Sequence, residues 1–131
     1  MTIRPVSTQD APEPAGHYSQ AVVHGGFVFV AGQLPLDPAT GEVVGAPDDI
    51  TAQTRQVLGN VAAILKAAGS GLDRLVSVTV FITSRSQWPA VNRVYAEVLG
   101  AHRPARAVIP VLELRPGCLI EVQAIAATGA A

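Results

Sequence analysis

Arg106 is the side chain in this sequence whose chemistry most requires a partner. It stands in the otherwise uncharged run PARAVIPVL, residues 104–112. A guanidinium does not lose its proton in a protein, and it presents a rigid fork that fits a carboxylate. Because an unpaired buried charge is costly, Arg106 requires an anion from either the protein or a ligand.

Glu121 is the candidate for a second charged group beside Arg106. Alternation along residues 119–126 places Ile120, Val122 and Ala124 on one face and Glu121 on the other. The apolar face suits contact with helices, so we expect Glu121 and Arg106 to share the opposite face. Spacing alone favours a structural ion pair or a solvated edge. The functional alternative is an anion-binding cation beside an acid–base carboxylate at a subunit interface.

An α+β order of strands and helices is expected to carry these residues. Gly25-Gly26 indicates a hairpin turn, and helical apolar spacing starts at a capping Asp48 or Asp49. The expected strands are a short one near Ile3 and residues 18–24, 27–31, 76–82, 105–112 and 119–126. The expected helices run from Asp48 or Asp49 to Gly69 and from Ser84 or Ser86 to Gly100. Right-handed crossovers place both helices on one face of a six-stranded sheet.

The other face of that sheet is also expected to be apolar. In residues 105–112, one face carries Ala107 and Ile109, and the other carries Val108 beside Arg106. A strand that is apolar on both faces is typically buried on both, yet two helices cover only one. Charged residues form 15 % of the chain, against about 25 % in typical domains. We therefore expect another subunit to cover the second face.

Composition narrows the class of protein further. The length of 131 residues fits a single domain spanning 1–131. A net charge of -1 gives no electrostatic footprint for nucleic acid or a membrane surface. One cysteine and three scattered histidines show no metal-ligand spacing, and no phosphate loop or other cofactor motif occurs. We expect a cytoplasmic protein without metal or cofactor, since neither a signal peptide nor a membrane span is visible.

Several short motifs, taken in order, resemble one family. They are GHYSQAV at 16–22, AGQLP at 31–35, TG at 40–41, ITAQT at 50–54 followed by Asn60, VNRVY at 91–95, PAR at 104–106, IEV at 120–122 and AIA at 124–126. The chain resembles the RidA family, the YjgF-type reactive-intermediate (enamine/imine) deaminases. The likeness extends from about Gly16 to Ala126.

The resemblance implies a chorismate-mutase-like α+β fold and a homotrimer whose sheets pack into a central barrel. It also implies three active sites at the subunit junctions. By this resemblance, Arg106 grips the substrate carboxylate and Glu121 positions water or moves protons. Tyr18 lines the pocket, Gly32 contributes backbone, and Asn92 is the corresponding helix asparagine. From local context alone, these last three residues also fit a strand start, a strand end and a solvated helix position.

The chain departs from the family pattern at several positions. His17 replaces the usual proline of the first motif, and Ala31 replaces the small polar residue before Gly32. Val108 stands where a cysteine is often found in the pocket wall, so the single Cys118 is not that residue. The loop 100–103 is also short.

The implied activity is hydrolysis of 2-imino or 2-enamino acids, such as 2-iminopropanoate, to 2-keto acids and ammonia. The alternative is a non-catalytic trimeric binder of small carboxylates such as 2-keto acids, which the changes at Ala31 and Val108 slightly favour. Holding unfolded proteins or cutting RNA, both attributed to relatives, are further alternatives. The near-neutral charge argues against RNA.

Overall fold

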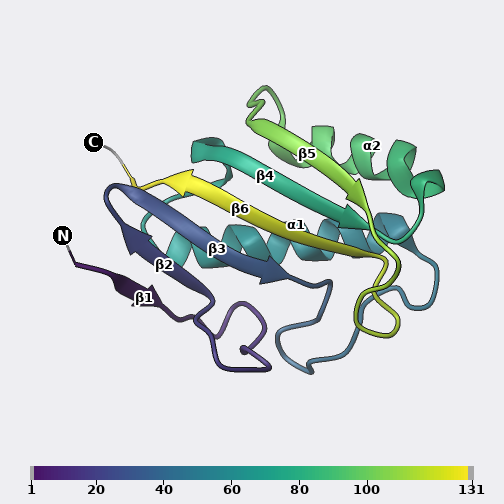
Figure 1. The fold of residues 1–131 in the computed structure, drawn as a ribbon, viewed down its shortest axis with the longest axis horizontal. Coiled ribbons are helices and arrows are strands. Elements are labelled where there is room, and N and C mark those ends of the chain that lie inside the picture. The colour runs from purple at the N-terminus through teal and green to yellow at the C-terminus, as the bar shows by residue number, and fades with distance from the viewer. Residues whose placement is uncertain (1, 130–131) are drawn as a thin grey trace.

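One six-stranded sheet organises the chain, and both helices lie on the same face of it (Figure 1). The computed structural model describes residues 2–129. The strands are β1 (Arg4–Val6), β2 (Ala21–His24), β3 (Phe27–Gln33), β4 (Leu75–Ile82), β5 (Ala105–Pro110) and β6 (Ile120–Ala127). The helices are α1 (Ile50–Ala67) and α2 (Trp88–Leu99), with 3-10 turns η1 (Leu72–Arg74) and η2 (Arg85–Gln87). The expected mixed α+β sheet is confirmed.

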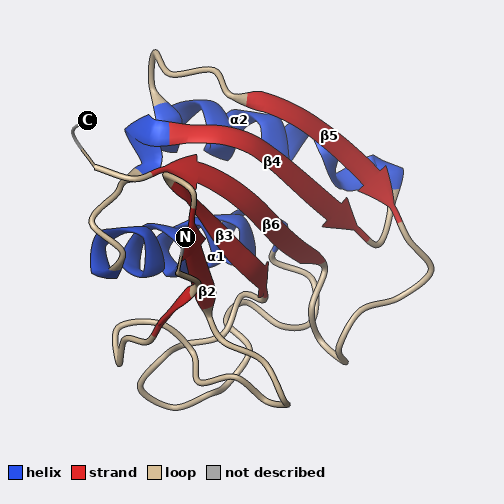
Figure 2. Cartoon of the chain, turned by 60° about the vertical axis from the view of Figure 1, so that its left-hand side comes forward, coloured by secondary structure: helices blue, strands red, loops and turns tan. Residues whose placement is uncertain are grey.

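The spatial order of the strands is β1-β2-β3-β6-β4-β5. Only β4 and β5 pair in parallel, and the other neighbours pair antiparallel. The last strand of the sequence therefore inserts between β3 and β4. As a result, β4 lies between β5 and β6, as Figure 2 shows.

Local signals in the sequence account for the ends of the elements. Gly25 and Gly26 adopt φ values of 60° and 84°, which connects β2 to β3 in the expected hairpin. The Asp49 side chain accepts a hydrogen bond from the Ala52 N–H at 3.0 Å and caps α1. Ser84 forms a capping box at the turn that leads into α2, and Gly100 ends that helix.

Between the helices and the sheet lies the apolar core. From α1, Val57, Val61 and Ile64 enter this core and are almost completely buried. Trp88 and Tyr95 pack from α2 against the same core. The helix-covered face of the sheet supplies Val28, Val30, Val78, Val80, Ile82, Ile120, Val122, Ala124 and Ala126.

The opposite face, here called the open face, is apolar and exposed within one chain. Phe27, Phe29 and Ile109 are each more than two-fifths exposed. The two phenylalanine rings contact each other with centroids 6.5 Å apart. The apolar character predicted for the open face is confirmed, and its coverage by another subunit stays a prediction. No helix among residues 2–129 has the length and apolarity needed to cross a membrane.

Several strand boundaries differ by one to three residues from those predicted, and β3 extends to Gln33 instead of ending at Ala31. The strand expected from Tyr18 begins at Ala21, because the Tyr18 N–H donates to the Gly16 carbonyl at 3.1 Å and keeps this segment in a turn. The strand expected to reach Leu112 ends at Pro110, and the Leu112 side chain is fully exposed.

Candidate functional site

Arg106 and Glu121 lie on opposite faces of the sheet. In the strand register, Arg106 pairs with Val78, whereas Glu121 pairs with Phe81, whose other neighbour is Ile109. Paired residues point to the same face, so Arg106 lies on the helix-covered face and Glu121 on the open face. The prediction that the two charges share a face is wrong for one chain. The strands β5 and β6 follow each other in sequence, but β4 separates them.

On the helix-covered face, Arg106 lies against α2. Its Cζ atom is 4.8 Å from the centroid of the Tyr95 ring. A hollow of about 540 Å³ beside it is lined by Asn92, Tyr95, Leu99, His102, Arg103 and Arg106, among others. Within residues 2–129 the Arg106 guanidinium forms neither an ion pair nor a hydrogen bond. The arrangement leaves an exposed cation available to an anionic ligand.

Of the other two predicted residues near Arg106, only Asn92 lines this hollow. It lies on α2, one helical turn before Tyr95, and is exposed. Val108 is on the same face of β5 but packs against the core, partly buried. We name Asn92, Arg106 and Val108 the arginine group.

Across the sheet, the Glu121 carboxylate lies over the backbone of Gly32. A Cβ atom added to Gly32 would be 3.1 Å from the Glu121 Cδ and would collide with its Oε2. Gly32 lies at the register shift between Val30 and Gln33, where β3 stops pairing regularly with β6. The absence of a side chain at this position therefore makes room for the carboxylate.

Glu121 also has no partner among residues 2–129, since no ion pair or hydrogen bond reaches its carboxylate. Burial raises the pKa of Glu121 above its usual value, because desolvation disfavours the charged form. A raised pKa makes a carboxyl group a better proton acceptor, which suits a general base.

Tyr18 and Gly32 line one small pocket together. The Tyr18 hydroxyl accepts a hydrogen bond from the Ala15 N–H at 3.2 Å, and the side chain is half-exposed. The six predicted site residues thus form two groups in one chain. One group, which we name the glutamate group, consists of Tyr18 in the segment before β2, Gly32 in β3 and Glu121 in β6. The arginine group belongs to α2 and β5.

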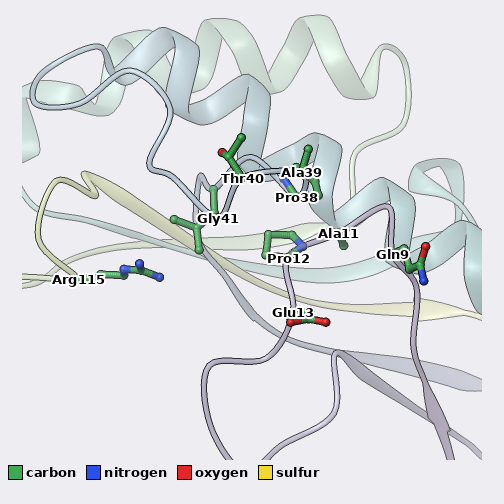
Figure 3. Close-up of a pocket in the computed structure, with 10 residues that line it drawn as sticks. Gln9, Ala11, Pro12, Glu13, Pro38, Ala39, Thr40, Gly41 and Arg115 are labelled. Atoms are coloured by element: carbon green, nitrogen blue, oxygen red, sulfur yellow. The ribbon is translucent and has the colours of Figure 1, made fainter.

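A larger hollow of about 640 Å³ adjoins the small pocket and shares with it Pro12, Glu13, Leu36 and Arg115. The Glu13 and Arg115 side chains reach toward this space (Figure 3). No ion pair joins them. No sequence motif points to Arg115, whose only local signal is a charge in the turn before β6.

Three buried amide side chains hold the loops that surround these two hollows. Gln20, Gln53 and Asn60 are each at most 3 % exposed. The contacts run from Gln20 to Thr8, Ala11 and Pro12, from Asn60 to Leu34 and Leu36, and from Gln53 to Gly117 and Leu119. Because buried amides bond specific backbone groups, they fix the loops relative to the core. Among residues 2–129, no three His, Cys, Asp or Glu side chains gather as a metal site would require.

Comparison with known proteins identifies the family. The model described as Endoribonuclease L-PSP matches residues 8–128. The chain belongs to this family. The chain is 39 % identical to the 2-iminobutanoate/2-iminopropanoate deaminase of Capra hircus, over 96 % of this chain and 90 % of that protein. The resemblance to RidA (YjgF-type) proteins is therefore confirmed.

Two other RidA-family proteins extend the comparison. A RutC family protein of Pyrococcus horikoshii is 48 % identical over 92 % of this chain and 94 % of its own length. The crystal structure of the YjgF gene product of E. coli superposes with a TM-score of 0.88, with 38 % identity and coverage of 95 % of this chain and 98 % of that one. The fold of this RidA-family chain is thus shared over almost its full length.

We predict that Gln53→Met destabilises this RidA-family chain by about 1–3 kcal/mol. Its Nε2 donates to the Gly117 carbonyl and its Oε1 accepts from the Leu119 N–H, both at 2.7 Å. Methionine fills a similar volume but leaves two partly buried backbone groups without their partner, and such a loss costs about 1–3 kcal/mol where water does not replace the bond. Denaturant unfolding measures the change, with Gln9→Met at an exposed position as the control. Equal midpoints for the two variants would contradict the role given to Gln53.

Proposed function

We propose that this RidA-family protein hydrolyses 2-imino and 2-enamino acids to 2-keto acids and ammonia at a site shared by two copies of the chain. One observation carries the proposal. Arg106 and Glu121 are each without a partner in residues 2–129, yet they lie on opposite faces of the sheet. Because the two groups face opposite sides of the sheet, the arginine group of one copy is proposed to meet the glutamate group of another.

The open face supports such an assembly. It exposes Phe27, Phe29 and Ile109, and an apolar surface of this kind is characteristic of a contact between subunits. Glu121 lies on the same face, beside Phe81. We propose a homotrimer in which the open faces pack together. A neighbouring copy then brings its edge strand β5, and with it Arg106, to the Glu121 pocket.

The reaction suits these two groups. A 2-imino acid carries a carboxylate beside its C=N bond, and the Arg106 fork binds that carboxylate through two parallel hydrogen bonds. This contact orients the C=N carbon for attack by water. Glu121 accepts a proton from the attacking water and passes it to the imine nitrogen, which gives a neutral carbinolamine. It then accepts the proton of the carbinolamine hydroxyl and passes it to the nitrogen, which leaves as ammonia while the C=O bond forms.

The demand on catalysis is modest, because free imines already hydrolyse in water. General acid–base assistance contributes about 10²- to 10⁴-fold. The names of two relatives support this chemistry, since the Capra hircus and Bos taurus proteins are 2-iminobutanoate/2-iminopropanoate deaminases at 39 % and 38 % identity. No cofactor takes part in the proposed steps.

The test follows the lifetime of the imine. An L-amino acid oxidase generates the 2-imino acid from alanine, leucine or methionine, and semicarbazide traps the imine that survives. We expect the wild-type protein to reduce the trapped fraction at catalytic concentration. If it accelerates none of these imines but binds the 2-keto acids, the protein is a carboxylate binder instead. Val108, which places no thiol beside Arg106, is the feature that favours this alternative.

We predict that kcat/KM decreases toward acid pH, and that this decrease is centred at a pH above the usual pKa of a glutamate. The raised pKa of Glu121 keeps the carboxyl protonated over part of the mildly acidic range. In this proposal the ionised form activates water, so activity falls as pH decreases through that raised pKa. The profile, corrected at each pH for uncatalysed hydrolysis, measures this decrease. Glu121→Gln should lower the rate and remove the decrease; an unchanged decrease would assign it to another group.

A further inference from the structure

The guanidinium of Arg106 lies over the face of an aromatic ring instead of beside a carboxylate. The ring belongs to Tyr95 on α2, and its centroid is 4.8 Å from the Arg106 Cζ. A guanidinium within about 6 Å of a ring centroid is attracted by the negative face of the π-system. Tyr95 is thus the one stabilising contact for the Arg106 charge that we find among residues 2–129.

A ring and a carboxylate affect Arg106 differently. A protein carboxylate would use the in-plane N–H groups, which are the groups that bind a substrate carboxylate. A ring face attracts the cation without accepting those hydrogen bonds. Tyr95 therefore holds the guanidinium in place while its donors stay available.

The Tyr95 hydroxyl does not explain why the residue is there. Its Oη atom is buried and has no hydrogen-bond partner among residues 2–129. Burial raises the pKa of Tyr95, and the Arg106 charge opposes that shift less strongly. The side chain therefore remains neutral near physiological pH and does not pair with Arg106 as a phenolate.

We propose that Tyr95 is a positioning residue whose ring orients Arg106 and keeps its N–H fork available to the substrate carboxylate. The proposal rests on the role given to Arg106 above. Tyr95 packs against the core from the same side of α2 as Val98, one helical turn further along. The Tyr95 ring is therefore held as firmly as the helix itself.

Two substitutions separate the ring from the hydroxyl. Tyr95→Leu removes the ring, and we expect it to raise KM for a 2-imino acid about 2- to 30-fold, the range of a cation–π contact. The Kd for pyruvate, a non-reacting 2-keto acid, should rise by a similar factor, with little change in kcat. Tyr95→Phe keeps the ring and should leave KM and Kd near their wild-type values. Its thermal midpoint should equal or exceed that of the wild type, because an unpaired buried hydroxyl is lost.

Val98→Ala is the control for general loosening of α2, since it shortens a neighbouring side chain on the same face of the helix. It should lower the thermal midpoint without changing KM. A Tyr95→Leu variant with wild-type KM and Kd would overturn the proposal, as would a Tyr95→Phe variant as weak as Tyr95→Leu. Arg106→Ala distinguishes the proposed role of Arg106 from that of Tyr95. If Arg106→Ala retains full activity, the role proposed for Arg106 is wrong. If Arg106→Ala loses activity while Tyr95→Leu does not, only the role proposed for Tyr95 is wrong.

Discussion

Replacing Arg106 by alanine is expected to lower kcat/KM for 2-imino acid hydrolysis at least about 100-fold, because the variant loses both substrate attraction and substrate orientation. The chain should still fold. Arg106 is exposed and forms no ion pair within residues 2–129, so its removal leaves no buried acid unpaired. The semicarbazide assay measures the rate, and circular dichroism and sizing check the fold and the assembly.

Arg103→Ala is the matched control for Arg106→Ala. Both arginines are exposed and line the same hollow beside α2, but only Arg106 lies over the Tyr95 ring. We expect Arg103→Ala to keep most of the activity. Arg106→Lys should fall between the two, since it retains the charge and loses the bidentate fork. If the Arg103 and Arg106 variants were equally impaired, the hollow would act through its net charge and the specific role of Arg106 would fail.

Much of the fold could be predicted because its signals are local. Gly25 and Gly26 form a hairpin turn that does not depend on where the two strands lie in the sheet. Asp49 caps α1 through a contact with a residue three positions later. Alternation along β6 correctly separates Ile120 and Val122 from Glu121. These features depend on side chains within a few residues of one another, so a single sequence contains them.

The relation between Arg106 and Glu121 is not local, and the prediction failed there. Alternation tells which residues of one strand share a face, but it does not relate one strand to another. That relation depends on β4, which lies between β5 and β6 and pairs with each in its own register. A shift of one residue in either register would have brought the two charges to one face.

Two further features of the site also depend on long-range contacts. Tyr95 packs against the core from α2, but nothing in the local sequence shows that an arginine from β5 lies over its ring. Gln53 is a polar residue within an apolar helix pattern, and its partners lie more than 60 residues later, at Gly117 and Leu119. Buried amides in a predicted helix are therefore worth examining as anchors of distant loops.

The unpaired state of the two charges is informative in itself. The ion pair found among residues 2–129 joins Arg55 and Glu97 on the surface. Neither residue lines the hollow beside Arg106. Exposed pairs of this kind contribute little to stability. The chain thus leaves Arg106 and Glu121 without such a partner, which is the arrangement expected of groups whose partner is a ligand.

The proposed homotrimer, with each site shared between two copies, makes its strongest prediction for mixtures of two inactive variants. Arg106→Ala keeps Glu121, and Glu121→Gln keeps Arg106, so each should be nearly inactive alone. In a mixed ring, the Arg106 of a Glu121→Gln copy can face the Glu121 of an Arg106→Ala copy. Every trimer that contains both kinds of copy then has one intact junction, which gives about one-third of the wild-type rate.

Co-expression of differently tagged variants, followed by two affinity steps, isolates the mixed trimers for this measurement. Purified Arg106→Ala carrying both tags is the control for purification and for trace wild-type protein. A second control combines wild-type copies with copies that carry both substitutions; junctions between two wild-type copies should retain activity there. Mixed Arg106→Ala and Glu121→Gln trimers that stay as inactive as their parents would place the site within one chain. That result would contradict the conclusion drawn from the opposite faces of the sheet, because Arg106 and Glu121 would then have to act together without a second copy.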